Sequence, residues 1–306
     1  MARKKVDPLS VRIIIEIVVL SAVLIGLLIG IGAVWAGVDG SEGDPTGSTG
    51  SNQGGNQGGS QCGQAGPGNQ DTEPLDMTPE AVLQRFIENN GLTRADYPDF
   101  VLESYQKCAD LYGEYFECRD FYLNYPLLKD VPHEIDISGL DRSNGVPLML
   151  QWDERWGYLE YGVSVCGIGG CGPTSLSMVA YYLTGDSKYT PAYMMQYATE
   201  NKHVIPTGGT DWSLFGTGAV ELGFQVEQLP NVERTVAKRL EAGIPVVVNV
   251  GPGTFTTGGH YMVLVGYENG MFRINDPNSP EYSSRLWAWD DFQDQVRNFW
   301  AISNPK

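Results

Sequence analysis

Hydrophobic and polar positions divide the chain into stretches of different character. Residues 13–36 read IIIEIVVLSAVLIGLLIGIGAVWA, and Glu16 is their one charged residue. Residues 37–74 carry almost no large apolar side chains, residues 75–145 show apolar positions at helical spacing, and residues 146–306 mix helical and strand patterns. These patterns predict a membrane-spanning helix, a disordered linker, a small helical region and an α+β domain, in that order.

The apolar run at 13–36 is long enough to cross a bilayer. At 1.5 Å per residue it would form about 36 Å of helix. Basic residues precede the run and acidic residues follow it, so residues 1–12 are expected in the cytoplasm and the rest outside the cell. A cleaved signal peptide ending before Gly37 is the alternative. The length of the run favours a retained anchor, and thus a single-pass protein of the cell membrane with an extracellular C-terminal domain.

The next two regions carry no catalytic pattern. Residues 37–74 consist mainly of Gly, Ser, Asn and Gln, which predicts a flexible tether. Thr78, followed by proline and an apolar face, predicts a capped helix that stops at Gly91. A second, aromatic-rich amphipathic stretch is expected to end at Pro126. We interpret 75–145 as a helical spacer or a pad against the following domain, rather than a binding module.

The region 146–306 begins with helices and continues with strands. Leu176, Val179 and Leu183 share one face of a predicted helix that starts at Cys171 and ends at Gly185. Further helices are expected within 191–201 and 231–243. Three β-rich runs follow, at 244–250, 260–268 and 271–277, and Asn269-Gly270 between the last two is a strong hairpin turn signal.

Composition excludes several kinds of function. The net charge is −17 and the chain has no basic patch, so a nucleic-acid partner is not expected. The five cysteines include no Cys-x-x-Cys pair, and there are three histidines in all, which argues against a zinc cluster. Neither a metal nor any other cofactor is predicted.

Cys171 stands out as a candidate nucleophile. It is flanked by Gly170 and Gly172 and lies at the start of its helix, where unpaired N–H groups and the helix dipole favour the thiolate. The glycines would let a substrate backbone approach closely. The alternative is a buried, unreactive cysteine, which is the commoner case for this residue.

A cysteine nucleophile needs an imidazole and a group that orients it. His260 enters a strand after a glycine pair, and the Asn269-Gly270 turn brings it to the same end of a hairpin as Asp276. Strict register for a two-residue turn puts Asn275, rather than Asp276, on the face of His260, although a bulge would change this. The pattern therefore leaves the orienting residue open. His133 and His203 lie in loop-like stretches and are expected to be structural or exposed.

Six motifs in fixed order carry a resemblance to a known family. They read VPLMLQWDERWG, GCGPTSLSMVAYYLTG, GTDWSLF, GIPVVVNV, GGHYMVLVGY and NDP, and they span roughly 146–302. In this order they resemble the papain-type cysteine peptidases related to the bacteriocin-leader-processing (double-glycine) peptidases. The resemblance implies a papain-like fold, in which the nucleophile heads a central helix packed on an antiparallel sheet.

The resemblance also implies a role for each site residue. It assigns Cys171 as nucleophile, His260 as base and Asp276 as the acid that orients the imidazole. Gln151 falls on the glutamine that stabilises the oxyanion. Gln151 precedes the thiol by twenty residues, farther than in many papain-type enzymes, so fixing its own loop is an equal alternative.

Taken together, the sequence predicts a membrane-tethered extracytoplasmic cysteine peptidase that acts through an acyl-enzyme on a peptide or protein substrate, with cell-wall peptide among the candidates. Cell-wall amide cleavage and transglutaminase-like acyl transfer would use the same triad. A non-catalytic binding module is the third alternative, with aromatic side chains lining its groove: Trp152, Trp156, Trp212, Tyr261 and Trp287.

The remaining cysteines raise the question of disulfides. Cys108 and Cys118 lie ten residues apart, and outside the cell they could form a disulfide. A bond between Cys166 and Cys171 would block the nucleophile, so Cys171 is predicted to be free. The sequence leaves open the substrate and whether residues 75–145 cover the cleft as a pro-segment would.

Overall fold

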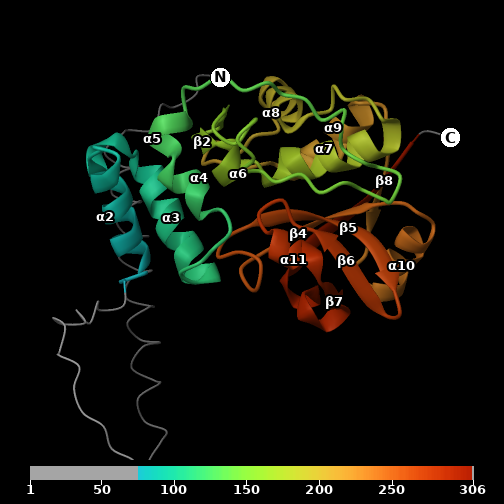
Figure 1. Cartoon of the computed structure of the whole chain (residues 1–306). Coiled ribbons are helices and arrows are strands. Elements are labelled where there is room, and N and C mark those ends of the chain that lie inside the picture. Colours follow the sequence, from blue (N-terminus) through green and yellow to red (C-terminus); the bar gives the residue numbers. More distant parts are fainter. Residues whose placement is uncertain (1–74, 305–306) are drawn as a thin grey trace, which may run out of the picture. The chain divides into compact units, whose positions relative to one another are not determined.

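The structure is a computed structural model that describes residues 75–304 (Figure 1). The predicted cytoplasmic segment 1–12, membrane helix 13–36 and linker 37–74 lie outside the described residues. Between residues 75 and 304, no helix has the length and apolar character that crossing a membrane requires.

An antiparallel sheet of six strands underlies the site. The strand order is β3-β8-β4-β5-β6-β7, and every neighbouring pair is antiparallel. The strands are β3 (Gln225–Leu229), β4 (Val246–Val250), β5 (His260–Glu268), β6 (Met271–Asn275), β7 (Leu286–Ala288) and β8 (Val296–Ser303). A separate two-stranded ribbon pairs β1 (Glu160–Tyr161) with β2 (Ser164–Val165).

Helices precede the sheet and also interrupt it. Those before the first strand of the large sheet are α2 (Pro79–Asn89), α3 (Asp99–Tyr112), α4 (Arg119–Leu123), α5 (Tyr125–Leu128), α6 (Cys166–Gly169), α7 (Cys171–Thr184), α8 (Pro191–Glu200) and α9 (Thr217–Glu221). Within the sheet-forming part lie α10 (Glu233–Glu241) and α11 (Pro280–Ser284). Short 3-10 turns occur at Arg94–Asp96, Trp212–Leu214, Trp289–Asp291 and Gln293–Gln295. The α+β class is confirmed.

The sheet is buried on both faces, which explains its long apolar runs. On one face, Val247 and Val263 pack against α7, whose Leu176 is fully buried. On the other face, Val248 packs in a second core with Val236 of α10. Each such side chain contributes about 1.5–3 kcal/mol by leaving water. The predicted arrangement, a central helix packed on an antiparallel sheet, is therefore confirmed (Figure 1).

The sheet differs from the predicted one in its strands. Helices were expected first and strands afterwards, but β3 precedes α10 in the chain. The last strand, β8, pairs with both β3 and β4 and so lies inside the sheet, not at its edge. The hairpin turn is as predicted, because Asn269 and Gly270 both adopt positive φ, 53° and 81°.

The helical segment 75–128 contains more breaks than predicted. Thr78 caps α2 as expected, its hydroxyl accepting a hydrogen bond from the Ala81 N–H. The aromatic stretch, however, does not run on to Pro126. It breaks at Gly113, where φ is 85°, and Pro126 instead lies in the first turn of α5. A positive φ ends a helix, and proline is compatible with the first helical turn.

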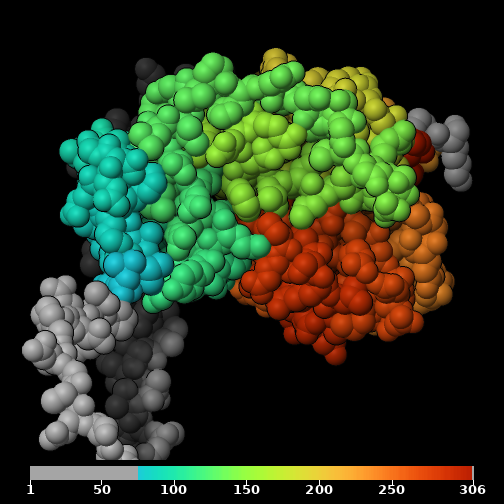
Figure 2. Space-filling view, in the orientation of Figure 1, coloured from blue at the N-terminus to red at the C-terminus, as the bar shows by residue number. Residues whose placement is uncertain are grey.

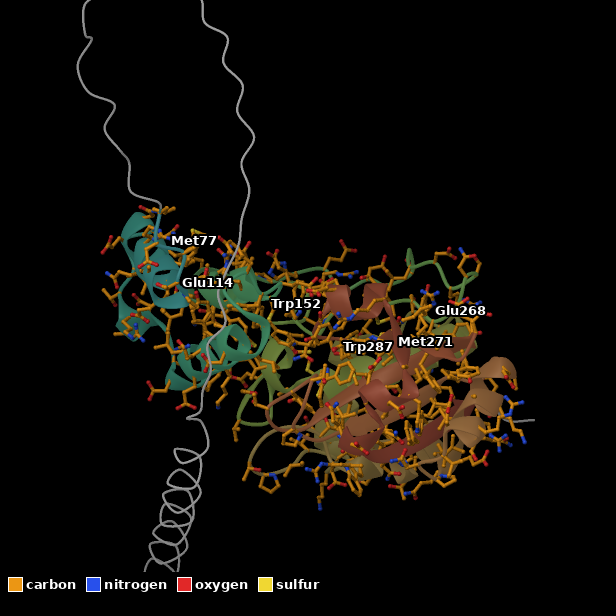
Figure 3. The ribbon with its side chains drawn as sticks, turned by 90° about the horizontal axis from the view of Figure 1, so that it is seen from below. Met77, Glu114, Trp152, Glu268, Met271 and Trp287 are labelled. Atoms are coloured by element: carbon orange, nitrogen blue, oxygen red, sulfur yellow. The ribbon has the colours of Figure 1, made fainter. Side chains whose placement is uncertain are left out.

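This helical segment packs directly against the rest of the described chain. Phe121 of α4 stacks on Tyr158, with ring centroids 4.7 Å apart. The space-filling view shows the green helical segment in contact with the red C-terminal part (Figure 2). Trp152 lies between the helices and the sheet (Figure 3), and its Nε1 donates to the Asn278 carbonyl at 2.9 Å.

Candidate active site

Cys171 is the first residue of α7, where the helix presents N–H groups without intrahelical partners. The thiol is 9% exposed and lines two cavities. The neighbouring glycines serve packing rather than substrate approach, contrary to the prediction. A Cβ at Gly172 would overlap the Thr210 side chain, and one at Gly170 would overlap Cys166.

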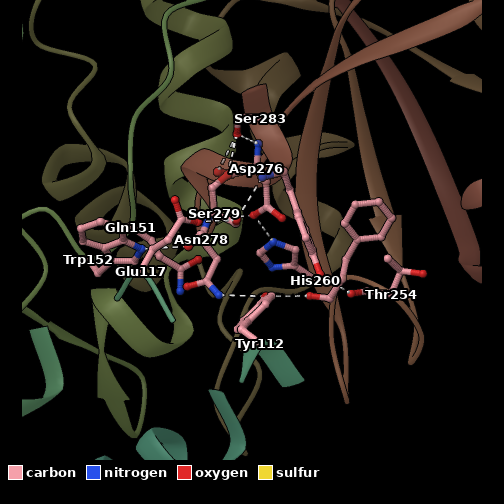
Figure 4. Close-up of polar contacts among 12 residues, drawn as sticks. Tyr112, Glu117, Gln151, Trp152, Thr254, His260, Asp276, Asn278, Ser279 and Ser283 are labelled. Atoms are coloured by element: carbon pink, nitrogen blue, oxygen red, sulfur yellow. Dashed lines mark hydrogen bonds and ion pairs between the residues drawn. The ribbon is translucent and has the colours of Figure 1, made fainter. Parts of the chain in front are cut away.

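His260 and Asp276 form a buried pair beside this thiol. His260 opens β5, Asp276 directly follows β6, and the distance from His260 Nε2 to Asp276 Oδ1 is 2.7 Å (Figure 4). The Cys171 side chain lines the same cavity as the imidazole and is close enough to raise its pKa. Since Nε2 bonds to the carboxylate, the nitrogen left for the thiol is Nδ1. The three predicted residues therefore meet at one site.

A β-bulge explains why Asp276, and not Asn275, contacts the histidine. Leu264 pairs with Ile274 and Gly266 pairs with Arg273, so Val265 has no partner in the register. The extra residue changes, by one position, which side chains of the paired strands point to the same face of the sheet. Asn275 consequently points the other way, and its Nδ2 donates to the Val146 carbonyl at 2.9 Å.

The surroundings of His260 stabilise its charged form. Burial has the largest effect and lowers the pKa of the imidazole. The charge and hydrogen bond of Asp276, together with the Cys171 side chain, outweigh that effect and raise the pKa to about 10. The charged imidazolium is thus the favoured form of His260 at neutral pH.

Gln151 lies at the same site but its amide is already engaged. Its Nε2 donates to the Gly167 carbonyl at 2.9 Å, and its backbone N–H donates to the Pro277 carbonyl at 2.7 Å. Its Oε1 is buried without a hydrogen-bond partner among the described residues. The same Nε2 makes a longer contact of 3.5 Å with the Ile168 carbonyl, and Gln151 lines the cavity that contains Cys171.

Two cavities meet at the thiol. One, of about 450 Å³, is lined by Gln151, His260 and several residues of α3. The other, of about 430 Å³, is lined by Gly208, Gly209, Trp212 and other side chains. Cys171 and Gly259 line both, so the thiol lies where the two cavities adjoin. That arrangement suits an extended chain with residues on either side of a reacting bond.

The aromatic residues considered as a ligand groove divide into two groups. Trp212 is half exposed and lines the second cavity together with Tyr261. Trp156 and Trp287 are buried in the hydrophobic cores. The histidine His203 is buried and structural, its Nδ1 bonding to the Ser213 hydroxyl at 2.8 Å.

Every cysteine between residues 75 and 304 is a free thiol. Cys166 is fully buried, and burial raises the pKa of its thiol. The disulfide considered between Cys108 and Cys118 is not formed, although the two side chains are near enough to hydrogen-bond. Over the same range, no group of three or more His, Cys, Asp or Glu side chains is arranged to hold a metal ion.

Two contributions to the site were not predicted from the sequence. The backbone N–H of Asn278 donates to Asp276 Oδ1 at 2.8 Å, a local turn that the Asp-Pro-Asn sequence could have indicated. The second is the wall built by α3, where Cys108 and Tyr112 line the first cavity with Cys171. No motif in α3 marks it as part of a cleft.

Comparison with known proteins places the chain in a family. The profile of the Peptidase_C39 like family matches residues 143–305, more than half of the chain. Among solved structures, the chain is similar to the peptidase domain of Streptococcus ComA, described as a bifunctional ABC transporter involved in a quorum-sensing pathway. The identity is 25% over 44% of this chain and 92% of that one, with a TM-score of 0.36.

A second similar structure is described as a C39-like peptidase from Bacillus anthracis. It is 21% identical over 56% of this chain and 98% of that one, with a TM-score of 0.32. No curated protein matches the sequence. The resemblance to bacteriocin-processing cysteine peptidases is confirmed by the family match, and the chain belongs to the Peptidase_C39 like family.

Proposed function

We propose that this protein hydrolyses peptide bonds through an acyl-enzyme formed on Cys171. The observation that carries the proposal is the position of one buried imidazole, which bonds to the Asp276 carboxylate and shares a cavity with the Cys171 thiol. A nucleophile, a base and an orienting group in hydrogen-bond contact are the parts that covalent catalysis by cysteine requires.

In this mechanism the Cys171 thiolate attacks the carbonyl carbon of the scissile bond. Negative charge then develops on the carbonyl oxygen, which the Cys171 backbone N–H and Gln151 Nε2 would stabilise. His260 donates its proton from Nδ1 to the leaving amine, and a thioester remains on Cys171. The neutral imidazole next takes a proton from water, whose oxygen attacks the thioester and releases the acid and the thiolate.

Asp276 contributes through His260. Its bond to Nε2 fixes the ring so that Nδ1 faces the thiol, and its charge stabilises the imidazolium. The carboxylate itself transfers no proton in this sequence of steps.

Activity against peptides provides the test. The full chain, a Cys171→Ala variant and a Cys166→Ala control would be incubated with a peptide library, and new termini identified by mass spectrometry. We expect cleavage by the parent and by Cys166→Ala, and none by Cys171→Ala. Cys166 suits the control because its thiol is fully buried in the parent. Equal cleavage by Cys171→Ala would contradict the proposal.

Two additions to the same assay separate the other reactions open to this triad. Peptide–amine conjugates formed in the presence of an added amine would indicate acyl transfer. Release of fragments from purified peptidoglycan, without cleavage of library peptides, would indicate a cell-wall amidase.

The location of the reaction is part of the proposal. The apolar run at 13–36, with basic residues before it and acidic residues after it, supports an anchor that leaves the peptidase part outside the cell. The Gly- and Ser-rich segment 37–74 would give the enzyme reach from the membrane surface.

A further inference from the structure

The loop that carries Asp276 is held from outside the family region. The profile match begins at residue 143, whereas two side chains that bind this loop, Tyr112 and Glu117, come from the end of α3 and the connection to α4. Figure 4 shows both residues beside the histidine–aspartate pair.

Tyr112 joins the two loops that flank the buried pair. Its hydroxyl donates to the Phe255 carbonyl at 3.1 Å and accepts from Asn278 Nδ2 at 3.1 Å. Phe255 lies in the loop before His260, and Asn278 lies in the loop after Asp276. One hydroxyl thus ties together the chain segments from which the two members of the pair emerge.

Asn278 transmits this contact to the carboxylate. Its backbone N–H donates to Asp276 Oδ1, the same oxygen that accepts from His260 Nε2. A shift of Asn278 would therefore alter the orientation of the carboxylate that holds the imidazole. Because burial raises the pKa of Tyr112, its hydroxyl remains a donor throughout the pH range in which enzymes are assayed.

Glu117 holds the continuation of the same loop. One carboxylate oxygen accepts from the Ser279 hydroxyl at 2.6 Å, and the other accepts from the Glu281 backbone N–H at 2.9 Å. Hydrogen bonds to a charged acceptor are about twice as strong as neutral ones. The carboxylate thereby fixes the start of α11, immediately beyond Asn278.

The helical segment also supports the opposite side of the site. Phe121 packs so closely on Gly167 that a Cβ there would overlap the ring, and the Gly167 carbonyl is the acceptor for Gln151 Nε2. Residues of α3 line the same cavity as the thiol. The segment therefore contacts the supports of Asp276 and of Gln151.

We infer that the helical segment 75–128 is a part of the active site, in which Tyr112 and Glu117 are positioning residues that hold the Asp276 loop so that Asp276 orients His260. The inference rests on the proposed cysteine chemistry of Cys171. It assigns the segment a role in catalysis that neither a spacer nor a removable pro-segment would have.

The test uses the full chain with Tyr112→Phe, Glu117→Ala and Glu117→Gln. Matched controls are Tyr115→Phe and Glu114→Ala, which alter exposed side chains on the same connection. The readout is the rate of iodoacetamide alkylation at Cys171, followed by mass spectrometry of its peptide from pH 4 to 10. Thermal unfolding is measured alongside. Alkylation needs no peptide substrate, so it decides this inference even where peptide cleavage fails.

We expect Tyr112→Phe and Glu117→Ala to slow alkylation of Cys171 below pH 7 about five- to tenfold, since His260 no longer holds its proton firmly beside the thiolate. Rates near pH 10 should converge with the parent. Glu117→Gln should be milder, because an amide oxygen still accepts one of the two bonds. The controls should follow the parent at every pH.

Two results would overturn the inference. One is a set of pH profiles for Tyr112→Phe and Glu117→Ala that superimpose on those of the parent. The other is a loss that is equal at all pH values and proportional to a fall in thermal stability, because that pattern indicates general loosening instead of positioning.

Discussion

At the scale of single residues, the chemistry depends on one carboxylate oxygen. Asp276 Oδ1 accepts from both His260 and the Asn278 backbone, while Oδ2 is buried with no partner among the described residues. A buried negative charge with so few donors is costly unless a cation lies beside it. Protonation of His260 supplies that cation, so the pair favours imidazolium.

Replacing this charge should change the pH dependence of catalysis. In Asp276→Asn the hydrogen bond can persist, but the charge that outweighs burial is gone, so the pKa of His260 must fall below its value of about 10. We expect kcat/KM at pH 7 to fall about 10²-fold or more and its alkaline limb to move to lower pH. The measurement is kcat/KM from pH 5 to 10. Asp130→Asn, an exposed control, should match the parent, and an unmoved limb in Asp276→Asn would refute this account.

A second prediction, on Gln151, separates stabilisation of the oxyanion from the reactivity of the Cys171 thiol. Gln151→Ala should lower kcat by about 10²-fold, because the tetrahedral intermediate loses a donor. Alkylation of Cys171 by iodoacetamide forms no oxyanion, so its rate should stay near that of the parent. A parallel loss of both rates would instead assign Gln151 to holding its own loop, the alternative that the sequence left open.

The site residues could be named from sequence, yet their geometry could not. The predicted start of a helix indicated Cys171, and the glycine pair before a hairpin strand indicated His260. The family resemblance added Asp276. An undistorted hairpin would have placed Asn275 against the histidine. Gly266, a glycine inside an otherwise apolar strand, was the one sign of a bulge in the sequence. Because of this bulge, Asp276 and not Asn275 points to the side of the sheet that carries His260.

At the scale of elements, a close contact between α4 and α6 links the helical segment to the peptidase region. The Phe121 ring contacts Gly167 and also stacks on Tyr158. The close approach requires a residue without a side chain at 167. This packing holds the carbonyl to which Gln151 is bound.

A methyl group at this position should therefore be costly. Gly167→Ala should lower the free energy of unfolding by about 1–3 kcal/mol, because the added Cβ overlaps the Phe121 ring. Urea unfolding followed by tryptophan fluorescence would measure it. Gly139→Ala, where a Cβ meets nothing within 4 Å, is the control and should be close to neutral. Equal stability of the two variants would show that the contact is looser than described.

Elements with strong local signals were predicted, and those without them were missed. The helices with caps and glycine stops, α2 and α7, begin and end where the sequence indicated. The strand β3 was missed because four of its five positions are exposed or partly exposed, so it lacks a clear alternation. The helices α4 and α5 have five and four residues, too few for a periodic pattern to be recognised.

At the scale of the whole molecule, the α+β class and the family could be inferred from motif order, but the docking of the helical segment could not. Periodicity shows which face of a helix is apolar and does not identify the surface that it meets. Tyr112 and Glu117 carry no motif, and their partners lie more than 140 residues later in the chain. Only the folded arrangement brings them to the catalytic loop.

Membrane attachment is the whole-molecule prediction that depends on the N-terminal sequence. The full chain should sediment with membranes and resist extraction by carbonate, while a chain lacking residues 1–36 should be released into the soluble fraction with its peptide cleavage intact. A protease added outside intact cells should remove the peptidase part. Release of the full chain by carbonate, or its loss of residues 1–36 on maturation, would contradict a retained anchor.

The most direct test of the account is detection of the acyl-enzyme itself. A cleaved peptide or an activated ester of it would be mixed with the full chain, quenched in acid within milliseconds to seconds, and analysed by mass spectrometry. The account predicts a mass increase equal to the acyl fragment on the peptide that contains Cys171, absent in Cys171→Ala and longer-lived in Asp276→Asn. Peptide cleavage that proceeds without any adduct on Cys171, and at the same rate in Cys171→Ala, would contradict it.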